Sequence, residues 1–332
     1  MRHRLTEGEI DMKNTLFTLN RRQFMMGSAA LLTSSVGWSQ TSGGVLRIGF
    51  QKSSVLISLL KAKATLEPLL AAKNLKVSWH EFSSGLPLLE ALNLGNVDFS
   101  ADVADTVPVF AQAAGAQLTY IAQEAPSPMA QAIVVRQDSS IRQVSDLKGK
   151  KVGVAKAAGA HYLLIAALEK SGLSFKDIEP AYLSPADGRA AFEKGAIDAW
   201  VVWDPFLSAV KVQGHARVIP VARDIASYQR YYLAADAYAK SNPDVLRILY
   251  QELKNAGVWL KKSPKEASTL LAGIWGIDAA IVEQANTHRS YEVREVTTAG
   301  LAEQQKIADA FFAEKLLPKR VDTKALAIFK PV

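Results

Sequence analysis

The sequence predicts an α/β fold built as two similar lobes, each with a mixed, mostly parallel sheet flanked by helices. The main observation is a duplication, because the pattern KGAID…WDP that begins at Lys194 has a counterpart, LGNVD…DTVP, that begins at Leu94. A second observation extends the match upstream, where RIGF from Arg47 corresponds to KVGV from Lys151. Each of these short apolar runs precedes a small polar loop and a helical pattern. A unit of about one hundred residues that is repeated once is too long for a solenoid, and two lobes with a ligand between them fit it better.

Length and composition limit the classes of protein that remain. The 332 residues suffice for one large domain or two ordinary ones, and 49% hydrophobic with 21% charged residues is typical of a soluble globular protein. The chain has no cysteine, which excludes disulfides, thiolate metal sites, thiolate nucleophiles and the lipid anchor of a bacterial lipoprotein. The net charge of +7 is spread out without a run of Lys or Arg, so nucleic-acid binding is not indicated.

Residues 1–40 are predicted to be an export signal. Arg21 and Arg22 precede the uncharged apolar run Gly27–Val36, and the small residues Gly37 and Ser39 follow. The apolar run is shorter than the ~20 residues that span a bilayer. A twin arginine before a modest apolar core resembles a twin-arginine signal, with an ordinary secretory leader as the alternative. We therefore expect a soluble periplasmic protein without a lipid anchor.

The first part of the mature chain is predicted to have the order β-α-β-α-β-α-β. Apolar runs predict strands at 45–50, 77–82, 97–100 and 118–122, and helical spacing predicts helices at 55–74, 87–94 and 107–114. Pro68 is expected to kink or break the first helix. Gly95 and Gly115 are expected to end the other two.

A break in composition at Glu124–Pro128 is the candidate crossing between the lobes. Beyond it we expect strands at 131–135 and 151–154, a short helix and turn at 141–150, a helix at 187–194, and a strand at 231–235 that returns toward the crossing. Two crossing segments make a hinge. One helix is expected to begin at Pro243, and three further helices are expected at 264–275, 278–287 and 298–317. These helices are expected to wrap the first lobe. The predicted organisation is lobe 1 at 41–128 and 240–332, and lobe 2 at 129–239.

The candidate binding loops lie where strands pass into helices. In open parallel sheets ligands bind beyond the carboxyl ends of strands, where unpaired N–H groups at helix amino termini attract anions. The loops that reach this position are 51–54, 83–85, 102–106, 157–161 and 203–205. Each of their serines taken singly is better explained as a helix cap, and Trp203 is equally explained as a core residue. Asp102 and Asp105 repel an anion, so they cap a helix, pair with a basic residue, or hold the amine of a zwitterion.

Catalytic motifs are absent from the sequence. The five histidines have no metal-ligand spacing, and no G-x-S-x-G, P-loop or G-x-G-x-x-G pattern occurs. His161 lies at a predicted helix start, where it is either a donor to a ligand oxygen or an exposed first-turn residue. We expect no enzyme activity, no metal and no cofactor.

At this point the chain resembles the periplasmic aliphatic-sulfonate-binding proteins of ABC importers, within the wider sulfonate, nitrate and taurine binding group. The resemblance runs from Leu46 to Lys319. The segments that carry it are LEALN (89–93), VFAQAAGA (109–116), DLKG (146–149), PAD (185–187), DAW (198–200) and WDP (203–205). It implies a type II periplasmic-binding-protein fold, the Venus-flytrap fold, and a monomeric receptor that presents an organosulfonate to an ABC permease in the inner membrane.

The resemblance also implies a ligand site. The sulfonate oxygens would meet Gln51, Ser53, Ser54, Ser84, Gly85 and the amides near Ala160 and His161, and Trp203 and Asp204 would close from the second lobe. Two departures change this lining: Ala157–Ala160 replaces the usual hydroxyl residues before His161, and the loop SADVADT, which contains Asp102, Asp105 and Thr106, is longer and more acidic. A sulfate ester, taurine or nitrate therefore remain alternatives, as does a role as a periplasmic ligand sensor.

Overall fold

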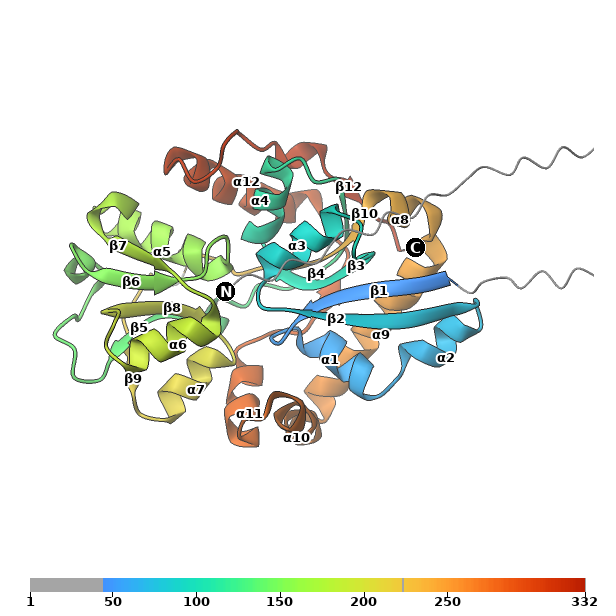
Figure 1. Ribbon diagram of the computed structural model, residues 1–332, viewed down its shortest axis with the longest axis horizontal. Coiled ribbons are helices and arrows are strands. Elements are labelled where there is room, and N and C mark those ends of the chain that lie inside the picture. The colour runs from blue at the N-terminus through green and yellow to red at the C-terminus, as the bar shows by residue number, and fades with distance from the viewer. Residues whose placement is uncertain (1–43, 223, 332) are drawn as a thin grey trace, which may run out of the picture. The chain divides into compact units, whose positions relative to one another are not determined.

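Two mixed sheets organise the described residues of the computed structural model, 44–222 and 224–331 (Figure 1). The predicted export signal at 1–40 lies outside these residues. Residues 42–332 form one contact unit, within which each sheet has its own set of flanking helices. No helix of the described chain is long and apolar enough to cross a membrane.

The larger sheet contains β1 (Gly44–Gln51), β2 (Leu75–Phe82), β3 (Phe99–Ala104), β4 (Leu118–Glu124), β10 (Arg230–Ala235), β11 (Val293–Arg294) and β12 (Ala327–Ile328). Its order is β11-β4-β10-β3-β1-β2, with β12 also beside β4. β1 pairs in parallel with β2 and β3, whereas β10 runs antiparallel between β3 and β4. The sheet is therefore mixed, with most strands in one direction.

Helices cover both faces of this sheet. One face is covered by four helices that share an apolar core with side chains such as Ile48 and Phe99: α1 (Val55–Ala62), α2 (Leu66–Ala71), α9 (Pro243–Lys262) and α10 (Pro264–Trp275). The opposite face is covered by α3 (Gly85–Asn93), α4 (Thr106–Ala113) and α12 (Thr298–Ala313). Two shorter helices, α8 (Asp236–Ser241) and α11 (Ala279–Thr287), complete this part.

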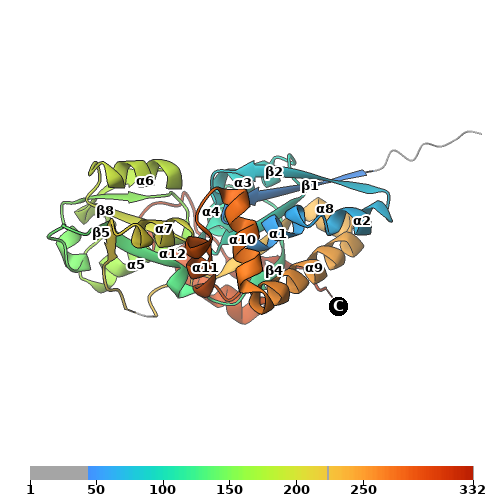
Figure 2. The ribbon, with the colours of Figure 1, turned by 90° about the horizontal axis from the view of Figure 1, so that it is seen from below.

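The smaller sheet has the order β7-β6-β8-β5-β9, with β5 (Gln131–Arg136), β6 (Lys151–Val154), β7 (Glu179–Tyr182), β8 (Ala199–Trp203) and β9 (Ala216–Val218). Its side chains alternate between two cores because successive residues of a strand point to opposite faces. Val201 and Trp203 pack on the side of α5 (Gly159–Lys170), whereas Trp200 and Val202 pack on the side of α6 (Pro185–Glu193) and α7 (Phe206–Val212). Figure 2 shows α5 and α6 on opposite sides of this sheet. Short 3-10 turns lie at 128–130, 144–147, 175–177 and 323–325.

The predicted duplication is confirmed at the level of individual hydrogen bonds. In the first lobe, Asp98 accepts from the backbone N–H of Arg47 at 2.8 Å, and its own N–H donates to the Arg47 carbonyl at 2.8 Å. In the second lobe, Asp198 makes the same two contacts with Lys151, both at 2.8 Å. The aspartate in LGNVD and KGAID thus fixes the entry of β3 beside β1 in the larger sheet and of β8 beside β6 in the smaller one.

Four sequence predictions need correction. The strand predicted at 97–100 extends to Ala104, so Asp102 lies inside β3 rather than in a loop. The first helix breaks at 63–65, which places Pro68 in the first turn of α2, and the last helix ends at Ala313 rather than residue 317. β10 pairs with β3 and β4, so the chain has already returned to the larger sheet by Arg230 and the predicted lobe boundary at 239 is too late.

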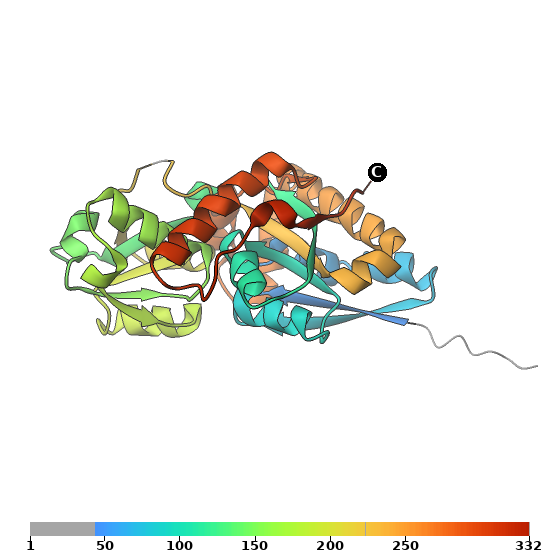
Figure 3. The same ribbon diagram turned by 90° about the horizontal axis from the view of Figure 1, so that it is seen from above.

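Helix α12 connects the two halves. It packs against α4 of the first lobe and α5 of the second (Figure 3). The core on this side of both sheets is therefore one continuous cluster of buried residues, in which Phe311 of α12 takes part.

Candidate functional site

A small cavity lies where the carboxyl ends of strands from both sheets meet the first turns of α3 and α5. Its walls are formed by Gln51, Ser84, Gly85, Leu86, Ala104, Val107, Lys156, Ala158, Gly159, Trp203, Tyr228 and Arg230. The first four N–H groups of a helix have no partner within the helix, and they carry a partial positive charge. The position is therefore the one that the strand–helix pattern predicts for a ligand.

The charged groups at the cavity are both cations. Lys156 and Arg230 line it, and no carboxylate of the described residues does so. Lys156 is exposed, whereas Arg230 has only 3% of its surface exposed. The apolar lining comes mainly from Leu86, Val107 and Trp203. The site thus suits a molecule with an anionic end and an apolar remainder.

Arg230 is held in place from two sides. Its Nη1 donates to Asp102 Oδ2 at 2.6 Å, and its Nη2 donates to the Tyr228 hydroxyl at 2.6 Å. Its Nε is buried without a hydrogen-bond partner among the described residues. A buried guanidinium N–H without a partner costs free energy until it meets an acceptor, and the anionic group of a ligand is such an acceptor.

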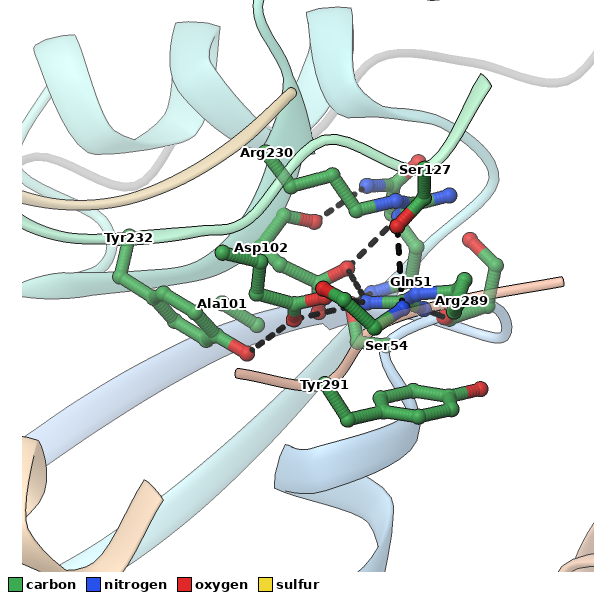
Figure 4. A network of polar contacts seen from close by, with 12 residues as sticks. Gln51, Ser54, Ala101, Asp102, Ser127, Arg230, Tyr232, Arg289 and Tyr291 are labelled. Atoms are coloured by element: carbon green, nitrogen blue, oxygen red, sulfur yellow. Dashed lines mark hydrogen bonds and ion pairs between the residues drawn. The ribbon is translucent and has the colours of Figure 1, made fainter. Parts of the chain in front are cut away.

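Behind Arg230 lies a buried network of two acids and two arginines (Figure 4). Arg289 donates from Nη2 to Asp102 Oδ2 at 3.0 Å and to both oxygens of Glu124 at 2.7 and 2.8 Å, and from Nη1 to the Ser53 carbonyl at 3.0 Å. Tyr232 donates its hydroxyl to Glu124 at 2.7 Å. The formal charges of the four ionisable groups cancel, which is what allows them to be buried together.

The network shapes the pKa values of its acids. Burial raises the pKa of Asp102, and the guanidiniums of Arg289 and Arg230 oppose that rise. Burial also acts to raise the pKa of Glu124, but the guanidiniums of Arg289 and Arg230 together with the hydrogen bonds from Arg289 and Tyr232 outweigh it, and the pKa lies below its ordinary value. Asp102 does not line the cavity. It acts as the counterion that fixes Arg230, so the interpretation that it pairs with a basic residue is the correct one.

Of the residues predicted for the site, four line the cavity: Gln51, Ser84, Gly85 and Trp203. Gln51 Nε2 donates to the Asp102 carbonyl at 3.1 Å, which joins the cavity wall to β3. Gly85 is required for packing as well, because a Cβ built there would lie 2.9 Å from a methyl group of Val107.

The other hydroxyl and acidic candidates are used inside the protein. Ser54 accepts from the Gln51 N–H through its Oγ at 3.1 Å, and Ser53 offers its carbonyl to Arg289. Asp105 accepts from the Gln229 N–H at 2.9 Å, and Thr106 donates its hydroxyl to the Ala157 carbonyl of the second lobe at 2.5 Å. None of these four lines the cavity.

Asp204 is also occupied by protein groups. Its Oδ1 accepts from the N–H of Ser208 at 2.9 Å and from the Ser208 hydroxyl at 2.6 Å, and its Oδ2 contacts His288 Nδ1 at 2.6 Å. Asp204 therefore anchors the start of α7 and makes a contact with the carboxyl-terminal part of the chain. It stands next to Trp203 but is not itself in the cavity wall.

His161 and Ala160 are buried within α5 and do not line the cavity. The imidazole of His161 packs against the rings of Phe175, Tyr182 and Phe311, and its Nδ1 accepts from the Ala157 N–H at 3.3 Å. Burial lowers the pKa of His161 to about 3, with Lys156 adding to the effect. The interpretation of His161 as an exposed first-turn residue is wrong, because its ring is buried among aromatic side chains.

Sequence reasoning missed Arg230, Tyr228 and Lys156. Arg230 had a visible signal, since a lone arginine stands at the start of the predicted buried strand 231–235. Lys156 lies two residues after the strand 151–154 and directly before the predicted loop 157–161. Tyr228 had none, because only the tertiary structure brings its segment to the cavity. Within the described residues, no cluster of His, Asp and Glu is arranged to hold a metal ion.

The chain is similar to known binding proteins over most of its length. A family model described as NMT1/THI5 like matches residues 70–267. The chain is 39% identical over 287 residues to a putative aliphatic sulfonates-binding protein of Escherichia coli K12, covering 86% of this chain and 89% of that protein. It is 32% identical to a protein of the same description from Bacillus subtilis, with 84% of each covered.

Solved structures agree with this result. The alkanesulfonate-binding protein SsuA from Xanthomonas axonopodis pv. citri, bound to MOPS, superposes with a TM-score of 0.81 at 38% identity, covering 86% of this chain and 98% of that one. A desulfurization enzyme, DszB, shares the fold at 15% identity with a TM-score of 0.60, covering 86% of this chain and 96% of that one. The fold is thus the predicted periplasmic-binding-protein fold, and it occurs in both binding proteins and an enzyme. The chain belongs to the NMT1/THI5-like family, in the group that contains the bacterial aliphatic sulfonate-binding proteins.

Proposed function

We propose that this protein is the solute-binding component of an ABC importer, and that it captures an organosulfonate between its two lobes. The observation that carries the proposal is the buried guanidinium of Arg230 at the cavity, with an unpartnered Nε and its counterion behind it. An anion that enters the cavity meets Arg230, Lys156 and the amides at the start of α3 and α5. Its carbon chain then contacts Leu86, Val107 and Trp203.

Capture requires the lobes to separate and close again. The cavity leaves about 20 Å³ for the centre of a water molecule, which is room for roughly one or two waters. An organic anion therefore enters only when the walls move apart. We infer that the segments near Ser127 and Tyr228, which are joined by backbone hydrogen bonds, form the hinge between the lobes.

The lining favours a simple anion over a zwitterion. The amine of taurine needs a carboxylate or several carbonyl acceptors, and no carboxylate of the described residues lines the cavity. An inorganic anion such as nitrate would leave the apolar wall of Leu86, Val107 and Trp203 unused. We therefore rank alkanesulfonates first and sulfate esters, which share the anionic end, second.

We also propose an oligomeric state and a location for this protein, and an absence of catalysis. We infer a monomeric periplasmic receptor without catalytic activity, which delivers its ligand to a permease in the inner membrane. The lack of any cysteine leaves no thiolate nucleophile. Product formation from a sulfonate by the purified protein would contradict this part.

A thermal-shift panel tests the ligand class. The compounds are alkanesulfonates, aryl sulfonates, alkyl sulfate esters, taurine, nitrate and sulfate. Binding to the folded state raises its stability by RT ln(1 + [L]/Kd), so Tm should rise with alkanesulfonate concentration and remain unchanged with taurine. A shift with taurine or nitrate alone would refute the assignment.

Paired variants locate the site. Trp203→Ala removes the apolar wall, and Ser84→Asp places a negative charge at the start of α3, so both should abolish the sulfonate-induced shift. The matched controls are Trp200→Ala, a buried tryptophan on the opposite face of the same strand, and Ser145→Asp on an exposed turn. Both controls should retain the shift relative to their own unliganded Tm.

A further inference from the structure

Three consecutive residues after α11, His288, Arg289 and Ser290, contact three different parts of the molecule. His288 contacts Asp204 of the second lobe. Arg289 enters the buried network behind Arg230 in the first lobe. Ser290 donates from its N–H to Ser127 Oγ at 3.1 Å and from its hydroxyl to the Ala125 carbonyl at 2.9 Å, on the crossing segment.

The contact between His288 and Asp204 has a defined polarity. A carboxylate oxygen accepts hydrogen bonds, so we assign Nδ1 of His288 as the donor to Asp204 Oδ2. The side chains are 15% and 4% exposed, and helices α11 and α7 pack against each other beside them. The other oxygen of Asp204 is used by Ser208, so the carboxylate is fixed in orientation.

The contact joins the lobes next to the ligand cavity. Trp203, which precedes Asp204, forms part of the cavity wall. His288 is followed by Arg289, whose guanidinium shares the Asp102 oxygen that Arg230 uses. The contact between His288 and Asp204 therefore holds the second-lobe wall of the cavity against the segment 288–289. Through Arg289 and Asp102, the same segment fixes the buried guanidinium of Arg230 in the first lobe.

We propose that His288 is a positioning residue for ligand capture, which clasps Asp204 in the closed state and keeps Trp203 against the bound molecule. This inference rests on the proposed binding function. The clasp forms only when the lobes are together, so it stabilises the closed state over the open one. It therefore slows ligand release and leaves the rate of capture by the open state nearly unchanged.

Stopped-flow tryptophan fluorescence with butanesulfonate tests the clasp. His288→Ala removes the donor and should raise koff by tenfold or more, with kon within about threefold of wild type. His288→Asn places an amide N–H where Nδ1 stood and should restore a koff close to wild type. Asp204→Asn should raise koff, and the double variant His288→Ala/Asp204→Asn should be no worse than the more affected single variant, because both remove one contact. The control is His80→Ala on the exposed strand β2.

Several results overturn the inference. They are an unchanged koff in His288→Ala, a koff in His288→Asn as high as in His288→Ala, or additive effects of the two single substitutions. Failure of the wild-type protein to bind butanesulfonate or any other sulfonate contradicts the proposed function instead. In that case small-angle scattering tests whether the contact between His288 and Asp204 holds the lobes together. The radius of gyration of His288→Ala should exceed that of the wild type, and equal radii would refute the contact's role.

Discussion

Gly159 offers a direct test of lobe closure. It is the first residue of α5 in the second lobe, and a Cβ built on it would lie 2.4 and 2.5 Å from two ring carbons of Tyr228 and 3.2 Å from the Cβ of Ala104 in β3. The nearest approach is about 1 Å shorter than an ordinary carbon–carbon contact. The Tyr228 ring cannot turn away freely because it is buried and its hydroxyl accepts from Arg230.

Gly159→Ala should therefore weaken ligand binding without weakening the fold. Forcing a methyl group into a packed contact costs about 1–3 kcal/mol. Ala104 belongs to the other lobe and Tyr228 to the crossing segment, so opening the lobes relieves the clash and the cost falls on the closed state. At about 1.4 kcal/mol for each factor of ten, the apparent Kd should rise by roughly 5- to 150-fold.

Isothermal titration with butanesulfonate measures the Kd, and circular dichroism measures the unliganded Tm. Gly273→Ala is the matched control, because Gly273 lies inside α10 and a Cβ there meets no atom within 4 Å. That substitution should raise stability by up to about 1 kcal/mol and leave Kd unchanged. A Kd for Gly159→Ala within twofold of wild type, or a fall in Tm that accounts for the lost affinity, would refute the assignment of this contact to the closed state.

Three further predictions concern charge and burial. Lys156→Ala should lower kon for butanesulfonate severalfold at low salt, because Lys156 attracts the anion to the cavity. The difference in kon from wild type should shrink at 0.5 M NaCl, because salt screens exposed charges. An equal difference at both salt concentrations would argue against this electrostatic attraction. Burial raises the pKa of Asp105 from 3.8 to about 7, so the folded state binds the proton more tightly, and stability should fall as pH rises from about 4 to 7, by at most about 4 kcal/mol. Asp105→Asn should flatten that part of the Tm–pH curve, and an unchanged slope would contradict the shift. His161→Leu should keep the Kd within about threefold whatever its effect on Tm, and loss of binding in a folded variant would restore His161 to the site.

Local sequence determined the repeating architecture. Patterns of a few residues predicted the strand at 151–154, the strand at 118–122 that the structure extends to Glu124, and the helix starts at Pro243 and Pro264. They also predicted the helix ends at Gly95 and Gly115, both of which have positive φ. Apolar alternation and the proline and glycine positions that start and end helices act over a few residues of sequence, so they can be recognised without knowledge of the fold. The duplication then predicted two lobes and a cavity between them, with Ser84, Gly85 and Trp203 in its wall.

Only the tertiary structure decided how the charged residues are used. Asp102 meets Arg230 across 128 positions of sequence and Arg289 across 187, and no local pattern encodes such a pair. The same holds for His161, whose core environment comes from Phe311 of a distant helix, and for His288 beside Asp204. A charge or an imidazole has the same sequence signature whether it faces a ligand, a counterion or an apolar core. The physical difference lies in desolvation and partners, which long-range packing supplies.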